Sequence, residues 1–217
     1  MTLYRPDVLH AIDTVFADQP VVLTIGGVIR EMLAVVGRKP NHLYSLDAMG
    51  QTVAIGLGLA LGLQDTERHA RVVVVEGDGS LLMGFSVLAT VGALKPSKLV
   101  VTVLDNGVYL ATGGQPTAAT ATEFVKVALD CGWAAAQDVP PDLAALRDAL
   151  GWARAAAGPT LLRIPVSTEQ PKTDFFLEDP VLLAGQFAAW LNAPVSDPSQ
   201  QPPEGSVWPR TRTRRQA

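Results

Sequence analysis

The sequence predicts an α/β domain built on a mainly parallel sheet with helices on both faces. Short runs of β-branched residues alternate along the chain with longer segments whose apolar residues recur at helical spacing, which is the pattern of that class. Two of the runs, residues 72–75 and 99–103, are apolar without alternation. Because such runs are typical of strands covered on both faces, we place these two at the centre of the sheet.

The expected elements follow from these two patterns, in chain order. Strands are expected at residues 21–25, 71–76, 99–104, 133–137 and 160–165. Helices are expected at residues 6–17, 28–36, 51–62, 81–94, 121–131, 141–157 and 179–191. The last helix is marked by Asp179, a candidate N-cap, and by Pro180 in the first turn.

Composition sets limits on the class of protein. With 217 residues, 48% of them hydrophobic, the chain is long enough for one substantial core. We expect one domain over residues 1–192 and a flexible Pro/Arg-rich tail over residues 193–217. The net charge is −4, and basic residues cluster only in that tail. This composition argues against a nucleic-acid-binding protein.

The sequence contains no sign of a membrane or an oxidising compartment. Cys131 is the only cysteine, so no disulfide can form within the chain. Residues 1–10 contain no apolar run of signal-peptide length. The longest weakly polar stretch, residues 52–63, is interrupted by glycines and is too short to span a bilayer. We therefore expect a cytoplasmic protein that has no membrane partner.

Polar residues follow both central strands at the point where each strand ends. The first strand leads into Gly77-Asp78-Gly79-Ser80, and the second leads into Asp105-Asn106-Gly107-Val108-Tyr109. Either motif alone is ordinary turn chemistry. Together they are informative, because ligands of open parallel sheets bind outside the carboxyl ends of the strands. Asp78 and Asn106 can therefore meet at one point.

The residue types of this pair indicate a metal-bridged diphosphate. A carboxylate and an amide oxygen are hard ligands suited to Mg²⁺, which completes its octahedron with phosphate oxygens and water. The glycines permit close backbone approach, and a helix that begins near Leu81 directs free N–H groups toward an anion.

With these motifs the chain resembles the thiamine-diphosphate enzymes, whose signature is Gly-Asp-Gly followed about 26 residues later by an Asn-containing turn. The resemblance implies the diphosphate-domain fold of that family. It implies that Asp78, Asn106 and the carbonyl group of Val108 bind Mg²⁺. It also implies that Gly77, Gly79 and Ser80 contact the diphosphate. The family often has a further asparagine where this chain has Asp105, which leaves the liganding asparagine intact.

The upstream segment Tyr44-Ser45-Leu46-Asp47-Ala48-Met49-Gly50 resembles the part of the family that holds the aminopyrimidine ring. The resemblance implies that Met49 supports the bent cofactor and that the backbone around Asp47 and Ala48 accepts a hydrogen bond from the pyrimidine amino group. The alternative for Met49 is a core position before an Ala/Gly-rich helix. Tyr109 is predicted to contact the cofactor, and it either lines the substrate pocket or packs below the metal turn.

Three further stretches narrow the resemblance to the phosphonopyruvate and sulfopyruvate decarboxylases. They are Gly26-Gly27-Val28-Ile29-Arg30-Glu31, Lys39-Pro40-Asn41-His42-Leu43-Tyr44 and Thr112-Gly113-Gly114-Gln115-Pro116-Thr117. The resemblance implies decarboxylation of a small anionic 2-oxo acid. Gln115 and the hydroxyl groups of Thr112 and Thr117 are expected to bond the substrate, with Tyr109 beside them. The alternative for this loop is a mobile surface turn.

The resemblance also implies that a second, pyrimidine-binding domain is needed and is supplied by another chain. In the family, a glutamate on a separate pyrimidine-binding domain bonds the pyrimidine ring nitrogen and activates the cofactor, and no such domain fits in this chain. Two-subunit sulfopyruvate decarboxylases divide the pyrimidine (α) and diphosphate (β) domains between chains. We therefore predict the β subunit of an α₂β₂ enzyme, inactive without the α subunit that supplies the glutamate.

Other chemistries on the same domain stay open. The chain fits the β subunit of a thiamine-diphosphate carboligase or 2-oxoacid oxidoreductase, or a non-catalytic cofactor-binding homologue. A dinucleotide-binding domain is disfavoured, because the first expected strand is followed by Gly26-Gly27-Val28-Ile29-Arg30 and not by Gly-x-Gly-x-x-Gly.

Overall fold

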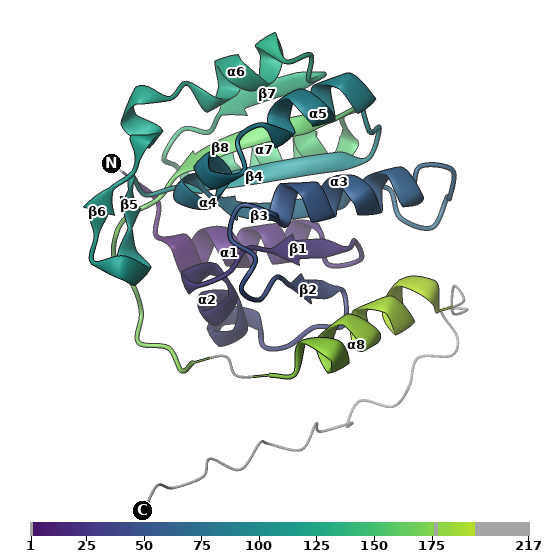
Figure 1. The fold of residues 1–217 in the computed structure, drawn as a ribbon, viewed down its shortest axis with the longest axis horizontal. Helices are drawn as coiled ribbons and strands as arrows, with labels where there is room; N and C mark the ends of the chain where they lie inside the picture. The colour runs from purple at the N-terminus through teal and green to yellow at the C-terminus, as the bar shows by residue number, and fades with distance from the viewer. Residues whose placement is uncertain (1, 176–177, 194–217) are drawn as a thin grey trace, which may run out of the picture.

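The computed structural model describes residues 2–175 and 178–193. Six strands form one sheet in the order β2-β1-β3-β4-β8-β7, and every neighbouring pair is parallel. The strands are β1 (Val21–Leu23), β2 (His42–Tyr44), β3 (Val72–Gly77), β4 (Leu99–Asp105), β7 (Ala135–Asp138) and β8 (Thr160–Pro165). The predicted fold class is confirmed, and β3 and β4 occupy the centre of the sheet as expected (Figure 1).

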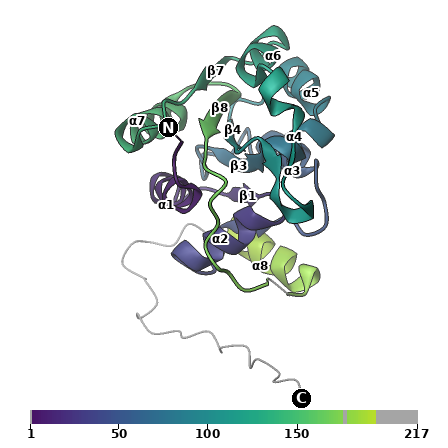
Figure 2. The same cartoon turned by 90° about the vertical axis from the view of Figure 1, so that its left-hand side faces the viewer.

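Helices cover both faces of the sheet (Figures 1 and 2). One face carries α1 (Arg5–Val15), α2 (Gly27–Val36) and α7 (Leu143–Ala155), and the other carries α3 (Thr52–Gly62), α4 (Asp78–Met83), α5 (Val87–Leu94) and α6 (Phe124–Asp130). Along β3, Val73 and Val75 pack into the first core and Val72 and Val74 into the second. The continuous apolar run therefore serves two cores at once.

The last helix, α8 (Pro180–Asn192), packs beside the edge strand β2. Its expected N-cap is present, because the Asp179 carboxylate accepts a hydrogen bond from the Val181 N–H group at 2.8 Å. Apart from Ala193, the predicted tail lies outside the described residues. No helix within residues 2–175 and 178–193 is long and apolar enough to cross a bilayer.

Several elements differ from the sequence-based expectation. The helix expected at residues 81–94 is two helices, α4 and α5, separated at Gly84. A Cβ on Gly84 would lie 1.9 Å from the Gly50 carbonyl oxygen, so a neighbouring segment passes directly over this break. The short strand β2 was not predicted at all. The helix expected at residues 121–131 begins instead with the 3-10 turn η2 (Ala118–Ala121), which precedes α6.

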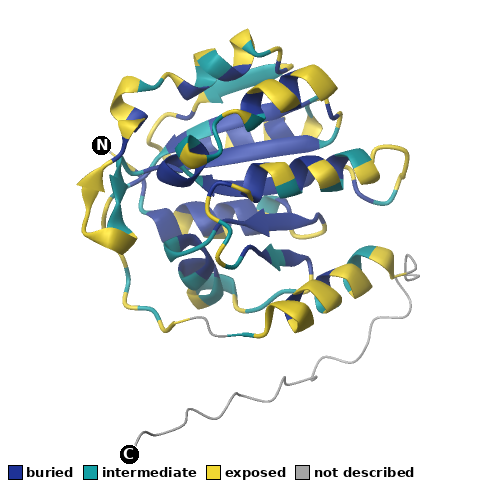
Figure 3. Cartoon of the chain, viewed as in Figure 1, coloured by how far each residue is buried: buried dark blue, intermediate teal, exposed yellow. Residues whose placement is uncertain are grey.

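A small hairpin leaves the carboxyl end of β4. Strands β5 (Val108–Tyr109) and β6 (Gln115–Pro116) pair antiparallel around the 3-10 turn η1 (Leu110–Thr112). We call residues 107–117 the hairpin. Its tip is exposed, in contrast to the buried central strands from which it extends (Figure 3).

Candidate functional site

The carboxyl ends of β3 and β4 bring the two predicted motifs together. Gly77 lies opposite Leu104 in the parallel register, so the next residues of both strands leave the sheet side by side. Asp78 begins α4 and is 3% exposed. The backbone N–H groups of Gly79 and Asn106 both approach its carboxylate. The sequence-based expectation that Asp78 and Asn106 meet at this edge thus agrees with the geometry.

The Asp78 carboxylate has no positive partner. Burial raises the pKa of Asp78, the nearby negative charge of Asp105 raises it further, and a hydrogen bond from Thr117 opposes the rise. No Lys, Arg or His within residues 2–175 and 178–193 forms an ion pair with it. Asp105, by contrast, is paired with Arg163 at 2.7 Å. A buried carboxylate without a cation fits a metal ligand.

The turn after β4 is held by its own side chains. The Asp105 carboxylate accepts a hydrogen bond from the Gly107 N–H group at 3.0 Å, and the Asn106 side-chain oxygen accepts one from the Val108 N–H group at 3.0 Å. Gly107 has a φ of 71°, a conformation that glycine adopts without strain. The turn therefore has a defined shape next to Asp78, whose carboxylate is approached by the Asn106 backbone N–H group. The roles of the Asn106 side chain and the Val108 carbonyl group as metal ligands stay predictions.

Tyr109 packs over the Gly-Asp-Gly turn. A Cβ on Gly79 would lie 2.3 Å from Cε1 of the Tyr109 ring. The Tyr109 hydroxyl group donates to the Gly79 carbonyl oxygen at 3.4 Å, a long hydrogen bond. This close approach explains why a residue without a side chain is needed at position 79. The structure contains the packing of Tyr109 against the turn. Its predicted contacts with the cofactor and the substrate stay predictions.

The Ser80 side chain points into the protein. Its hydroxyl oxygen accepts hydrogen bonds from the Gly50 N–H group at 2.9 Å and the Thr24 hydroxyl group at 3.2 Å. The hydroxyl therefore links the Gly-Asp-Gly turn to the predicted pyrimidine segment. The predicted contact of Ser80 with a diphosphate stays a prediction.

Sequence reasoning missed Glu76, which lies beneath this turn. Glu76 is fully buried at the end of β3. Burial raises the pKa of Glu76, and hydrogen bonds from nearby hydroxyl groups, including that of Thr24, oppose the rise. The available signal was an acid that ends an otherwise apolar strand.

The predicted pyrimidine segment is buried at both ends, at Tyr44 and Gly50, and reaches the surface at Asp47 and Met49. Asp47 has a φ of 53°, in the left-handed region that few residues other than glycine adopt. Met49 is 37% exposed, so the alternative that it fills the core is wrong. A Cβ on Gly50 would lie 3.1 Å from that of Met83, which is 62% exposed. The roles of Asp47, Ala48 and Met49 toward a cofactor stay predictions.

The three residues of the hairpin that are predicted to bond the substrate lie in two different environments. Thr112 and Gln115 are exposed, and the Gln115 amide group donates to the Thr112 hydroxyl group at 2.6 Å. Thr117 is buried, and its hydroxyl group donates to the Asp78 carboxylate at 2.6 Å. The Thr117 hydroxyl group is thus directed at the predicted metal ligand, and its predicted bond to the substrate stays a prediction.

The donor set fits Mg²⁺ with a diphosphate. Within residues 2–175 and 178–193, no group of three or more His, Cys, Asp or Glu residues is arranged to hold a metal. The predicted ligands are one carboxylate, one amide oxygen and one backbone carbonyl, which leaves positions for phosphate oxygens and water. Mg²⁺ is typically bound in this way, through one or two carboxylates together with substrate phosphates.

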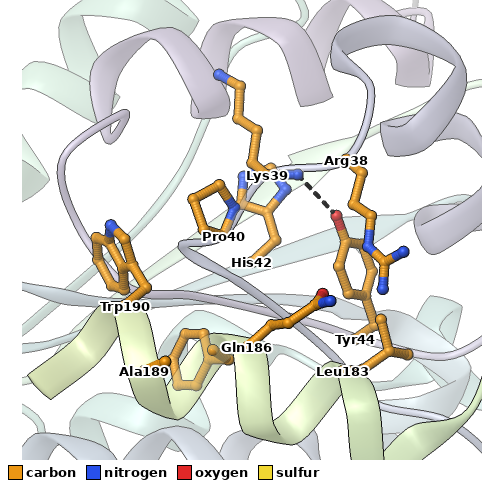
Figure 4. A pocket seen from close by; sticks show the side chains of 10 residues that line it. Arg38, Lys39, Pro40, His42, Tyr44, Leu183, Gln186, Ala189 and Trp190 are labelled. Carbon is orange, nitrogen blue, oxygen red and sulfur yellow. Dashed lines mark hydrogen bonds between the residues drawn. The ribbon is translucent and has the colours of Figure 1, made fainter. Parts of the chain in front are cut away.

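A cavity of about 270 Å³ lies elsewhere, between α8 and the loop that leads into β2 (Figure 4). Trp190 of α8 faces Pro40 across it, with Tyr44 on the same side as Pro40. Its two basic side chains, Arg38 and Lys39, are already paired with acidic residues. Tyr44 is the one residue of the predicted pyrimidine segment that lines this cavity, and no residue with a predicted catalytic, cofactor or metal role does so.

The fold and the strand-end site define the class of protein. Residues 27–164 match the model of the C-terminal TPP-binding domain of thiamine pyrophosphate enzymes. The chain therefore belongs to this family, whose cofactor is also called thiamine diphosphate.

Within the family the chain is similar to phosphonopyruvate decarboxylases and to sulfopyruvate decarboxylase β subunits. It is 38% identical to a phosphonopyruvate decarboxylase of Streptomyces viridochromogenes, over 95% of this chain and 51% of the relative. It is 41% identical to a phosphonopyruvate decarboxylase of Streptomyces hygroscopicus, over 74% of this chain and 39% of the relative. It is 34% identical to the sulfopyruvate decarboxylase subunit beta of Methanothermobacter thermautotrophicus, over 76% of this chain and 83% of that subunit. The chain thus spans about half, or less, of the Streptomyces relatives.

Solved structures agree on the fold. A structure from Mycobacterium smegmatis, described as a thiamin diphosphate-dependent enzyme, matches with a TM-score of 0.65 and 23% identity, over 77% of this chain and 32% of that one. Benzoylformate decarboxylase from Polynucleobacter necessarius matches with a TM-score of 0.64 and 19% identity, over 76% and 33%. At these identities the likeness establishes the fold alone.

Proposed function

We propose that the chain is the diphosphate-binding β subunit of a cytoplasmic decarboxylase that uses thiamine diphosphate and Mg²⁺. Its substrate is a small anionic 2-oxo acid of the sulfopyruvate or phosphonopyruvate type. The observation that carries the proposal is the buried Asp78 carboxylate beside Asn106 at the ends of the two central strands, which has no cationic partner within the described residues. The names of the Streptomyces and Methanothermobacter relatives support the substrate class.

Each part of the site has a distinct task in this proposal. Asp78, Asn106 and the Val108 carbonyl group would hold Mg²⁺, whose charge replaces the cation that Asp78 lacks. The backbone at Gly77, Gly79 and Ser80 would bind the diphosphate. When bound, thiamine diphosphate supplies the electron sink that allows CO₂ to leave a 2-oxo acid.

The residues on the pyrimidine and substrate sides would orient and shield the reacting groups. Met49 would support the bent cofactor, and the backbone at Asp47 and Ala48 would accept a hydrogen bond from it. Gln115 and Thr112 at the exposed hairpin tip would bond the distal anionic group of the substrate, and closure of this tip would exclude water.

A partner subunit is part of the proposal. Met49 and Met83 are both exposed, and Gly50, which follows Met49, lies against Met83. Exposed apolar side chains next to polar groups are typical of an interface. We propose that an α subunit covers them, supplies the glutamate that activates the pyrimidine ring, and assembles with this chain as α₂β₂. The similarity to sulfopyruvate decarboxylase β subunits supports this arrangement.

The test is a decarboxylation assay with thiamine diphosphate and Mg²⁺. The full chain is assayed alone and together with a candidate α subunit encoded by the neighbouring gene. Sulfopyruvate and phosphonopyruvate are compared with pyruvate, which lacks the distal anion, and CO₂ and the aldehyde product are measured. We expect turnover only when both subunits are present, and faster turnover of the two anionic substrates.

The other outcomes are equally informative. Turnover by the homogeneous isolated chain contradicts the need for an α subunit. A complex that binds the cofactor and joins two carbonyl compounds, or passes electrons to an acceptor, without releasing the aldehyde is one of the alternative thiamine enzymes. A complex that binds the cofactor and transforms no 2-oxo acid is a non-catalytic homologue.

A further inference from the structure

Thr117 is the buried end of an otherwise exposed hairpin. Residues 111–116 are exposed, whereas Thr117 is 5% exposed. Its backbone N–H group donates to the Gly107 carbonyl oxygen at 2.9 Å, which closes the hairpin at its base. Its side chain caps the following 3-10 turn, because the hydroxyl oxygen accepts a hydrogen bond from the Ala119 N–H group at 3.2 Å.

The direction of the Thr117 hydroxyl hydrogen follows from these contacts. A hydroxyl group has one hydrogen to donate and accepts through its oxygen. The Ala119 N–H group is itself a donor, so the hydroxyl hydrogen is free to point at the Asp78 carboxylate, 2.6 Å away. A hydrogen bond this short to an ionised carboxylate is among the stronger ones in proteins.

This hydrogen bond distinguishes the two oxygens of Asp78. Thr117 occupies Oδ2, which fixes the rotation of the carboxylate and leaves Oδ1 free of Thr117. Residues that hold a metal ligand in this way typically change metal affinity about 10- to 100-fold when they are replaced.

The hairpin therefore contacts the candidate metal site at both of its ends. It follows Asn106 directly and includes Val108, which are two of the predicted ligands, and it returns at Thr117, which bonds the third. The tip that carries Thr112 and Gln115 lies between these two anchors. Because Thr117 bonds Asp78, a ligand that holds the Asp78 carboxylate in place also restrains the returning strand of the hairpin.

We propose that Thr117 is a positioning residue that presents Asp78 to Mg²⁺ and couples metal binding to the order of the hairpin. The inference rests on the proposed function, because it assumes the Mg²⁺ and diphosphate site. By linkage, the hairpin conformation that improves Mg²⁺ binding is also stabilised by Mg²⁺.

The test is a calorimetric titration of Mg²⁺ into the full chain with its α subunit at saturating thiamine diphosphate. Thr117→Val removes the hydroxyl group and preserves the shape of the side chain. We expect it to raise the half-saturating Mg²⁺ concentration by about 10- to 100-fold. Thr117→Ser keeps the hydroxyl group and is expected to restore binding to within about threefold of the wild type.

The matched control is Thr102→Val. Thr102 is fully buried in β4, and its hydroxyl group donates to the Val74 carbonyl oxygen at 3.0 Å, away from the site. This variant also loses a hydrogen bond donated by a buried threonine hydroxyl group, here to a backbone carbonyl group, so it reports the cost to stability alone. We expect its half-saturating Mg²⁺ concentration to equal that of the wild type.

Hydrogen exchange gives a second readout that needs no variant. In the wild type, Mg²⁺ with thiamine diphosphate is expected to slow amide exchange at Thr117, whose N–H group closes the hairpin. Unchanged exchange there overturns the proposal even if Thr117→Val fails to fold. A half-saturating Mg²⁺ concentration in Thr117→Val equal to that of the wild type overturns it as well.

The outcomes separate this inference from the function on which it rests. If the wild-type complex shows no Mg²⁺-dependent cofactor binding, both proposals fall. If the wild type binds and Thr117→Val binds equally well, only the role of Thr117 falls.

Discussion

Acidic side chains at the two ends of the parallel strands differ in their partners. We call the end where the strands begin the amino edge and the end where they finish the carboxyl edge. At the amino edge, the Asp13 carboxylate lies 2.5 Å from the Lys39 ammonium group and 3.2 Å from the His42 ring. Burial opposes ionisation of Asp13, but the hydrogen bonds from His42 and Lys39 outweigh it, so its pKa is lowered. At the carboxyl edge, burial raises the pKa of Glu76 and of Asp78.

The difference separates charges that hold the fold together from charges that are available to a ligand. The amino-edge acids are compensated within the chain and stabilise it. At the carboxyl edge, Glu76 and Asp78 have no basic partner within residues 2–175 and 178–193, whereas Asp105 is paired with Arg163. Keeping a charge buried without a partner costs stability, so this edge is selected for something other than folding.

The largest expected effect comes from removing Asp78. Outer-shell partners of metals typically contribute about 10- to 100-fold, so we expect Asp78→Ala to lower kcat/KM of the αβ complex for its 2-oxo acid by more than about 100-fold. The matched change at the other edge, Asp13→Ala, is expected to lower the free energy of unfolding and to leave cofactor binding intact. Equal turnover of Asp78→Ala and the wild type would remove the metal site.

The next effect is steric. Gly79→Ala places a methyl group 2.3 Å from the Tyr109 ring, and such overpacking typically costs about 1–3 kcal/mol. Gly58→Ala, in the interior of α3 with no atom within 4 Å of the added Cβ, is expected to stabilise the chain by about 0.5–1 kcal/mol. Urea unfolding of the ligand-free chain measures both. The packing of Tyr109 on the turn is contradicted if Gly79→Ala is as stable as the wild type.

The two edges should respond to pH in opposite ways. The lowered pKa of Asp13 means that its ion pair stabilises the chain above the ordinary aspartate pKa and is lost as pH falls through the folded pKa. Asp13→Asn should therefore cost most near neutral pH and little in acid. The raised pKa of Asp78 means that its ionisation destabilises the ligand-free fold as pH rises through the folded pKa.

Asp78→Asn should accordingly stabilise the ligand-free chain near neutral pH, and this gain should vanish below the ordinary aspartate pKa. Urea midpoints of the wild type and both asparagine variants, measured between about pH 3 and pH 7, give the comparison. Parallel pH profiles for the two variants would mean that the edges do not differ.

The smallest expected effect is at the hairpin tip. Gln115→Ala removes one proposed hydrogen bond to the substrate, and one such bond is worth roughly a two- to tenfold change, so we expect KM to rise by that factor. Steady-state kinetics of the αβ complex measure it. An unchanged KM would leave Gln115 as a surface residue of the hairpin.

Much of the fold was predictable because the central strands are unusual in sequence. Residues 72–75 and 99–103 are apolar at every position or nearly so, a pattern that few other environments produce, and both strands lie where they were expected. Strand β2 has only three residues, too few to produce a period. The break between α4 and α5 depends on Gly50 passing over Gly84, a contact between distant segments.

In the site, too, features that follow from local sequence were predictable and contacts between distant segments were not. The placement of Asp78 and Asn106 at one end of the sheet was predictable, because each follows the end of a buried strand. The hydrogen bond between Thr117 and Asp78 joins residues 39 positions apart through the fold of the hairpin, so local sequence carried no sign of it. Glu76 was overlooked because a single acid at the end of an apolar strand has many explanations until its burial is known.

The central claim is that the carboxyl edge is completed by a metal ion and a diphosphate. Its most direct test is calorimetric titration of thiamine diphosphate into the full chain with its α subunit, with Mg²⁺ present and after chelation of divalent metal. We predict saturable binding of one cofactor per β chain that disappears on chelation and is restored by added Mg²⁺. Binding of equal affinity without divalent metal, or no binding in either condition, would contradict the assignment.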